Sequence, residues 1–200
     1  MILQPCGKAR YIVPTISPAK TYVTEFENMD IAIGFSTIDE IEQYLGVNNE
    51  EELEYDIVLV DTDKSQGVKN FRLEKSNKNY FVTSMDVYSL KKGLEALAGV
   101  EQVINLSKVY FSKDMSKEED DYLNFLSVNY KVIWDNEKLY FPIENGDLSV
   151  IYENQRFNKI NFKKLSIQYK DGIAYLAEDI MGDISDTQIR RVMKNMEKGA

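Results

Sequence analysis

Histidine is absent from this 200-residue chain, and cysteine occurs once, as Cys6. Without histidine the chain has no imidazole acid or base, no histidine metal ligand and no histidine-based catalytic triad. A single cysteine permits no internal disulfide, and no neighbour of Cys6 is placed to activate it as a nucleophile. The residue usage therefore excludes several classes of enzyme and indicates a reducing, cytoplasmic compartment.

Basic residues are fewer than acidic ones: the chain has 24 Lys and Arg and 33 Asp and Glu, which gives a net charge of -9. Sequence-independent nucleic-acid binding needs clustered cations, so no strong nucleic-acid binding is expected. The opening "MILQPCGKAR" lacks the apolar core of a signal peptide, and no stretch approaches the roughly 18 apolar residues of a membrane span. With 44% apolar residues we expect a single domain over residues 1–182, followed by a C-terminal tail over 183–200.

Apolar, strand-like segments alternate with helical patterns along the chain. The expected strands are 9–14, 29–36, 55–61, 79–84, 101–112, 129–134 and 138–144. The expected helices are 36–46, 85–99, 115–127, 163–182 and 185–198, and 67–79 is expected to be a polar connection. This alternation predicts an α/β fold with a doubly wound, mostly parallel sheet and helices on both faces. The strand over 55–61 is apolar on both faces, so we expect it at the centre of that sheet.

Three helices have clear local signals. Thr37 and Glu40 are spaced as a capping box at the start of the 36–46 helix. In the 85–99 segment one helical face is apolar, and the helix is expected to end at Gly99. That face carries Val87, Leu90, Leu94 and Leu97. The 163–182 segment has a similar face, formed by Leu165, Tyr169, Ile173, Leu176 and Ile180.

Several of these segments also carry a family resemblance. The segment "YDIVLVDTDKS" (55–65) followed by "YFVTSMDVYSLKKGLEAL" (80–97) resembles the central part of the ParA/MinD-type P-loop ATPases. The later "KLYFPIENGDLSVIYENQRF" and "LSIQYKDGIAYLAEDIMG" are similar to the C-terminal part of that family, so the resemblance covers residues 55–182. Within that family, the segments most resemble the pilus-assembly branch, TadZ and CpaE. The resemblance implies a P-loop NTPase-like fold in which Asp61 positions the water shell of magnesium and residues near Pro142 contact adenine.

The phosphate-binding loop of that family is missing. Such a loop is glycine-rich and ends in Lys-Thr or Lys-Ser, because consecutive backbone N–H groups surround the phosphates. Here "TISPAKT" (15–21) has Lys20 and Thr21 but no glycine, and Pro18 removes one donor. We therefore expect no hydrolysis, no bound cofactor and no metal. The vestigial nucleotide-site candidates are Lys20, Asp61, Thr62, Asp63 and Pro142.

Two alternatives stay open. Residues 10–112 also resemble a receiver domain of response regulators, in which Asp61, Thr83 and Lys108 would form a phosphorylation site. That family has an acidic pair after its first strand, and "YIVPTISP" has no carboxylate, so the receiver would be degenerate. The other alternative is a nucleotide-dependent ATPase that uses "TISPAKT" as an unorthodox phosphate site.

The tail from Thr187 to Lys198 has a helical, basic and amphipathic pattern. MinD-like proteins carry membrane-targeting helices at this position, but the apolar face here lacks Phe, Trp and Leu, so membrane contact would be weak. Docking on the chain's own domain and binding of a partner are the alternatives. The partner-binding candidates are Ile189, Arg190, Arg191, Val192, Met193, Lys194 and Met196. Together these features predict a non-hydrolysing scaffold or localisation protein, acting with partner proteins or as a homo-oligomer in a pilus, secretion or conjugation machine.

Overall fold

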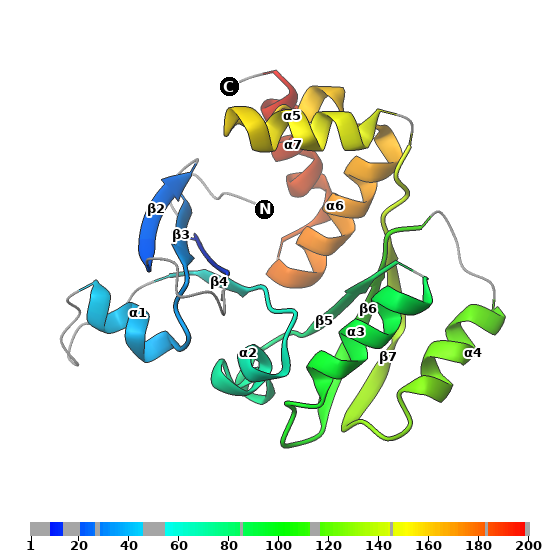
Figure 1. Cartoon of the computed structure of the whole chain (residues 1–200). Helices are drawn as coiled ribbons and strands as arrows, with labels where there is room; N and C mark the ends of the chain where they lie inside the picture. The colour runs from blue at the N-terminus through cyan, green and yellow to red at the C-terminus, as the bar shows by residue number, and fades with distance from the viewer. Residues whose placement is uncertain are drawn as a thin grey trace. The chain divides into compact units, whose positions relative to one another are not determined.

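The computed structural model describes residues 9–13, 21–26, 29–45, 55–84, 86–112, 117–144, 146–182 and 184–198. These residues form an α/β protein with one four-stranded and one three-stranded sheet (Figure 1). The chain divides into two compact units. The N-terminal unit comprises residues 2–76 and 92–104, and the C-terminal unit comprises residues 77–91 and 105–200.

The N-terminal unit contains the four-stranded sheet, in the order β2-β3-β1-β4. Its strands are β1 (Ala9–Val13), β2 (Tyr22–Phe26), β3 (Met29–Ile33) and β4 (Ile57–Val60). Strand β1 pairs in parallel with both β3 and β4, whereas β2 is antiparallel to β3. The core beside this sheet is formed by buried Ala32, Phe35, Ile41 and Phe71.

Short helices complete the N-terminal unit. Helix α1 (Ile38–Tyr44) begins where predicted, because the Thr37 side chain accepts a hydrogen bond from the Glu40 backbone N–H at 3.2 Å. The Glu40 carboxylate accepts the return bond from the N–H of Ser36, at 2.7 Å, one residue before the expected position. The segment predicted as a polar connection, 67–79, overlaps α2 (Ser65–Asn70) and contains the 3₁₀ helix η1 (Leu73–Lys75). That prediction is wrong because Val68 and Phe71 are apolar anchors, both buried.

The C-terminal unit contains the three-stranded sheet, in the order β5-β6-β7. Strands β5 (Tyr80–Thr83) and β6 (Ile104–Tyr110) pair in parallel. Strand β7 (Val132–Tyr140) is continuous where two strands were predicted, because the polar residues between them keep an extended backbone. The helices of the second half of the chain are α3 (Val87–Leu97), α4 (Lys117–Leu126), α5 (Asp147–Phe157), η2 (Phe162–Lys164), α6 (Ile167–Met181) and α7 (Asp186–Glu197).

The α/β class is confirmed, but the arrangement of strands differs from the prediction. The described strands lie in two sheets instead of one, and β4 is the last strand of the four-stranded sheet. The predicted central position of the 55–61 segment is therefore wrong, and Val58 is 46% exposed. None of the four residues of β4 is fully buried, because Ile57, Leu59 and Val60 are half-buried and Val58 is exposed. Strand β2 and helix α5 were not predicted.

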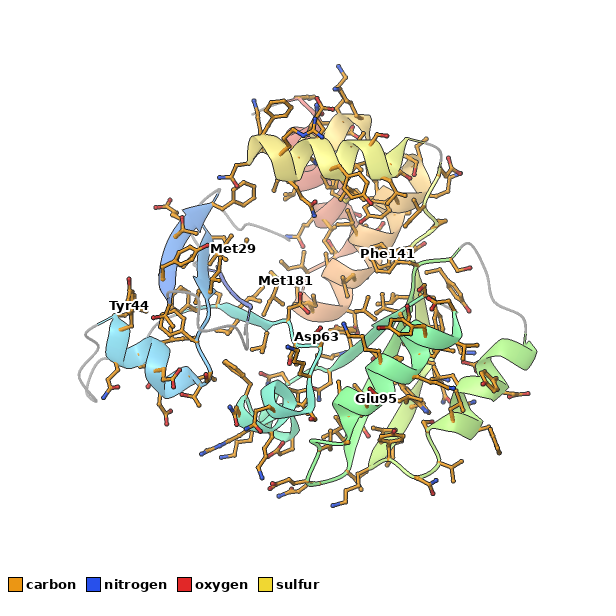
Figure 2. All side chains as sticks on the ribbon, viewed as in Figure 1. Met29, Tyr44, Asp63, Glu95, Phe141 and Met181 are labelled. Atoms are coloured by element: carbon orange, nitrogen blue, oxygen red, sulfur yellow. The ribbon has the colours of Figure 1, made fainter. Side chains whose placement is uncertain are left out.

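Helices α5, α6 and α7 share one core. Buried Val150, Phe162 and Leu165 contact Met193 and Met196 of α7. Helix α6 is closely packed where Gly172 faces the backbone oxygen of Tyr140 and the ring of Phe141, a residue labelled in Figure 2. Among the described helices, none is long and apolar enough to span a membrane.

Candidate functional site

The first candidate site is the carboxyl end of β4. Ile12 of β1 lies opposite Val60 of β4, so the ends of these two parallel strands are neighbours. In open parallel sheets such strand ends border the ligand crevice. Asp61, Thr62 and Asp63 directly follow β4, and Asp63 is labelled in Figure 2. Lys20, another of the vestigial nucleotide-site candidates, lies outside the described residues.

Thr62 and Asp63 form contacts within the protein. Asp63 forms an ion pair with Lys92 of α3 at 2.9 Å, and that hydrogen bond lowers the pKa of its carboxyl group. Thr62 donates to the carbonyl oxygen of Lys64 at 3.3 Å. Its side chain also packs against Gly67, where a Cβ atom would overlap the Thr62 hydroxyl. Both side chains therefore help to hold the segment between β4 and α2 in place.

The other sequence-predicted residues belong to the C-terminal unit. Pro142 follows β7 and is half-buried. The receiver alternative would use Thr83 and Lys108 together with Asp61, which belongs to the N-terminal unit. Thr83 is buried and donates to the carbonyl of Ser84 at 2.6 Å. Lys108 lies within β6 instead of following it, and it has other partners.

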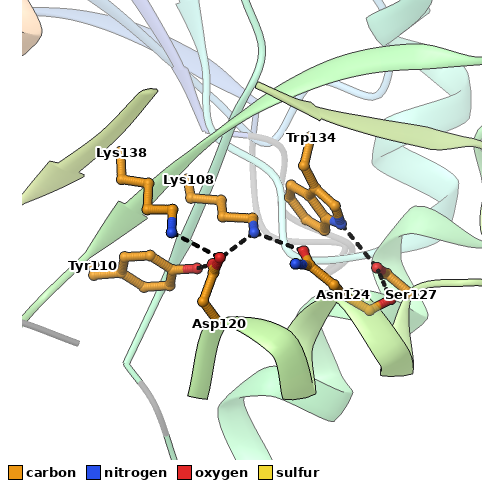
Figure 3. Close-up of polar contacts among 7 residues, drawn as sticks. All are labelled: Lys108, Tyr110, Asp120, Asn124, Ser127, Trp134 and Lys138. Atoms are coloured by element: carbon orange, nitrogen blue, oxygen red, sulfur yellow. Dashed lines mark hydrogen bonds and ion pairs between the residues drawn. The ribbon is translucent and has the colours of Figure 1, made fainter. Parts of the chain in front are cut away.

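Lys108 is the centre of the second candidate site, a polar cluster between the three-stranded sheet and α4 (Figure 3). Its side chain is almost fully buried, and its Nζ donates to Asp120 Oδ1 at 2.6 Å and to Asn124 Oδ1 at 2.7 Å. The other carboxylate oxygen of Asp120 accepts a bond from Lys138 Nζ at 2.7 Å. Tyr110 also donates to Asp120, at 3.2 Å. One carboxylate thus binds two lysines and a tyrosine.

Trp134 covers one side of Lys108. The lysine Nζ lies 5.1 Å from the centre of a Trp134 ring, a cation–π distance. The indole N–H donates to Ser127 Oγ at 2.8 Å, and the Ser127 hydroxyl donates to the carbonyl of Asn124 at 3.0 Å. The indole N–H and the three ions of the cluster thus have hydrogen-bond partners within the protein.

The charges of this cluster are compatible with burial. Burial raises the pKa of Asp120, but the hydrogen bonds from Lys108 and Lys138 outweigh it, and the net pKa lies below the ordinary value. The pKa of Tyr110 is raised, first by burial and then by the charge of Asp120. At neutral pH the carboxylate is therefore ionised and the tyrosine protonated. This arrangement anchors α4 on the sheet and gives no direct sign of proton-transfer chemistry.

Sequence reasoning identified Lys108 but missed its partners. The signal was a repeated Lys-x-Tyr pattern, "KVY" at 108–110 and "KLY" at 138–140, in two strand segments. Residues two apart on a strand share a face, and Asp120 and Asn124 are four apart on one helix face. The rings of Tyr110 and Tyr140 lie 5.9 Å apart, as this repeat would predict for neighbouring strands.

Helix α7 docks on its own unit. Ile189 is 2% exposed, and Met193 and Met196 pack in the core of α5 and η2, so this apolar face is not open to a membrane or a partner. Val192 is half-buried. Arg190 forms ion pairs with Asp171 at 2.8 Å and with Asp186 at 2.9 Å. Of the predicted partner-binding residues, Arg191 and Lys194 are exposed and have no ion pair with a described residue.

Comparisons with protein-family models and with curated protein sequences give no match to this chain. Within the described part of the chain, no three or more acidic or cysteine side chains converge in a group that could hold a metal ion.

Proposed function

We propose that this chain is a non-hydrolysing scaffold or localisation protein of ParA/MinD-like architecture, acting in the cytoplasm on partner proteins of a pilus, secretion or conjugation machine. The observation that carries the proposal is that Thr62 and Asp63, at the end of β4, are both engaged in contacts within the protein. At the strand edge where a nucleotide-binding fold would hold magnesium and phosphate, both contact other parts of the protein.

The strand order supports the architectural part of the proposal. From β3 the chain continues through α1 to β4, which lies on the other side of β1. Both pairings of β1 are parallel, so the strand order reverses around it as in doubly wound sheets. The exposed cations of α7, Arg191 and Lys194, provide a surface for a partner.

The test is a nucleotide assay on the purified full-length chain. With ATP and magnesium we expect phosphate release at background, and calorimetry should give a dissociation constant of about 1 mM or weaker, since base contacts alone supply roughly 4 kcal/mol. The Asp61→Asn variant should behave in the same way. Hydrolysis of ATP that is lost in the Asp61→Asn variant would contradict the scaffold function and indicate an ATPase. Micromolar binding that Lys20→Ala removes would make "TISPAKT" a phosphate loop.

A further inference from the structure

Strand β7 forms one edge of the three-stranded sheet. It is the last strand in the order β5-β6-β7, so β6 is its one partner among the described strands. Six of the seven residues of β6 are buried, whereas none of the nine residues of β7 is, as an edge position requires. Strand β7 is also the longest described strand. An edge of this length is a template on which a further strand can pair.

Alternate backbone N–H groups of β7 point away from β6. The N–H of Phe141, directly after β7, donates to the carbonyl oxygen of Tyr110 in β6, at 2.7 Å. Successive N–H groups of an extended strand point to opposite sides, so those of the even-numbered residues, Asn136 among them, point to the open edge. The rings of Trp134 and Tyr140 both lie on the α4 side of the sheet, which shows that the alternation is unbroken between them.

The other face of β7 is acidic. Asp135 and Glu137 are two residues apart on the strand, so their side chains share this face. Asp135 accepts a hydrogen bond from Ser107 of β6, whereas Glu137 is exposed. The hydrogen bond to Asp179 of α6, and then the charges of Asp135 and Glu137, raise the pKa of Lys78. Three carboxylates thus lie around one ammonium group, and negative charge is in excess beside the edge.

A second copy of β7 does not fit this edge. Because directly opposite side chains share a face of the sheet, an antiparallel pair of β7 strands has its twofold axis at one residue. The three registers with the longest overlap have this axis at Asp135, Asn136 or Glu137. They place Asp135 opposite itself, Asp135 opposite Glu137, and Glu137 opposite itself, respectively. Like charges directly opposite are destabilising, so these acids protect the edge against self-pairing but not against a basic strand.

We propose that β7 accepts an extended segment of a partner protein as a further strand, in which two basic residues, two positions apart, lie opposite Asp135 and Glu137. Apolar residues flank the basic pair, because Ile133, which is 56% exposed, and half-buried Leu139 lie on the same face of β7. The resulting pattern is the same in both strand directions. This inference rests on the proposed scaffold function and names the chemistry of its partner.

The experiment titrates a labelled synthetic peptide, Val-Thr-Lys-Thr-Arg-Thr-Val, with the full-length chain and measures its fluorescence anisotropy. We expect saturable binding. The same peptide with Glu in place of Lys and Arg should bind about tenfold more weakly or less, since two attractions become repulsions. Amide hydrogen exchange followed by NMR should slow at the outward N–H groups of Asn136 and Lys138 when the basic peptide is added. The N–H groups of Asp135 and Glu137, which point to β6, should change little.

A proline variant tests pairing through the backbone. Asn136→Pro removes an outward N–H and places a ring at the edge, while the N–H groups that point to β6 remain. We expect loss of both peptide binding and the slowed exchange. Asn136→Ala keeps the N–H and is the matched control, expected to bind within about twofold of the parent. Circular dichroism checks that each variant is folded.

A charge variant tests the acidic face without altering the backbone. Glu137→Lys should weaken binding of the basic peptide about tenfold and strengthen binding of the acidic one. The matched control is Glu95→Lys, which makes the same change at an exposed position of α3 and should leave the affinity within about twofold. This pair decides the test if Asn136→Pro does not fold.

Three outcomes would overturn the proposal. The first is peptide binding that persists in Asn136→Pro or leaves exchange in β7 unchanged, and the second is equal loss in Glu137→Lys and Glu95→Lys. The third is self-association of the chain in sedimentation that Asn136→Pro abolishes, which would assign the edge to a second copy. Failure of the peptide with no nucleotide turnover would reject this inference alone, whereas nucleotide turnover would reject the scaffold function whatever the peptide does.

Discussion

Lys108 is only 1% exposed, and the carboxylate of Asp120 compensates its buried positive charge. Replacing Asp120 by Ala leaves the Lys108 ammonium buried with Asn124 as its remaining hydrogen-bond acceptor. Because breaking a buried ion pair from one side leaves an uncompensated charge, we expect a loss of about 3 kcal/mol in the free energy of unfolding. Urea denaturation at pH 7 measures this.

The control for that variant is Lys138→Gln. Lys138 is bound to the same carboxylate, but its side chain is 30% exposed, so its ammonium retains contact with water. Partly exposed ion pairs contribute little, and we expect a loss of about 1 kcal/mol or less. A loss as large as that of Asp120→Ala would mean that the carboxylate, not the buried lysine, sets the energy of the cluster.

Asp147 makes stability dependent on pH. It is buried and accepts hydrogen bonds from the N–H and the hydroxyl of Ser166, both at 2.7 Å, and from the N–H of Glu144 at 2.9 Å. Burial raises the pKa of this carboxyl, but the three bonds outweigh it and the net pKa is lowered. Its contribution is therefore full above the unfolded-state pKa of about 4 and is lost as pH falls through the lower folded-state value.

The pH prediction concerns Asp147→Asn. We expect the variant to be less stable than the parent by about 1–3 kcal/mol at pH 7, since buried donors lose their charged acceptor. The difference should shrink as pH falls below about 4, because the parent carboxyl then takes up a proton. Urea midpoints measured from neutral to strongly acidic pH test this. A difference that is constant with pH would show that the carboxylate charge is not involved.

At the scale of elements, α6 depends on the absence of a side chain at Gly172. A Cβ atom there would lie 2.9 Å from the Tyr140 carbonyl oxygen and 3.0 Å from Phe141 Cδ1. In an exposed helix Gly→Ala stabilises by about 1 kcal/mol. Here overpacking reverses the sign, and we expect Gly172→Ala to destabilise by about 1–3 kcal/mol. Thermal unfolding tests this, with exposed Gln168→Ala of the same helix as the control, expected to change stability by less than about 0.5 kcal/mol.

Elements with local signals were predictable from the sequence. The capping pair Thr37 and Glu40 defines the start of α1, and Leu90, Leu94 and Leu97 of the predicted α3 stripe are buried. Helix α5 was missed because glycine, which precedes it at position 146, is typical of loops and has no side chain that could cap a helix. In the structure Gly146 is the N-cap residue, with a φ of 108°. The position of β4 at a sheet end was missed because an apolar run does not reveal how many neighbours a strand has.

The candidate sites were predictable only where residues adjoin in sequence. Asp61, Thr62 and Asp63 were identified from the end of an apolar run. Their contacts with Lys92 and Gly67 depend on how α2 and α3 pack. Lys108 was predicted as the lysine of a phosphorylation site. Its partner Asp120 belongs to α4, and the packing of this helix on the sheet could not be predicted from the sequence. Contacts between distant segments were thus the part that sequence reasoning could not supply.

At the scale of the whole molecule, charge is unevenly distributed. The net charge of -9 describes the complete chain, whereas residues 154–170 have five cations and no acid. The expectation of no strong nucleic-acid binding came from this average, which leaves local basic patches possible. Surface recognition depends on local potential, because screening limits the reach of exposed charges to about 8 Å at physiological ionic strength.

Helix α3 contributes residues to both units. Residues 87–91 belong to the C-terminal unit, and residues 92–97 belong to the N-terminal unit. Leu90 is buried in the first part, and Leu94 and Leu97 in the second. Because a helix of this length is not stable alone, loss of either half's packing removes support from the other. We therefore expect both units to unfold in a single transition.

Leu94→Ala tests this dependence. The substitution removes a buried side chain from the N-terminal unit and should destabilise by about 2–5 kcal/mol. Trp134 is the single tryptophan and belongs to the C-terminal unit, so its fluorescence and near-ultraviolet dichroism report on that unit. If the units unfold together, the midpoint measured with these signals will shift by the same amount as the midpoint measured by far-ultraviolet dichroism. Tyr88→Ala, at a 79% exposed position of the same helix, is the control and should leave both signals nearly unchanged. A Trp134 transition that stays at the parent midpoint while the far-ultraviolet transition splits would show that the units unfold independently.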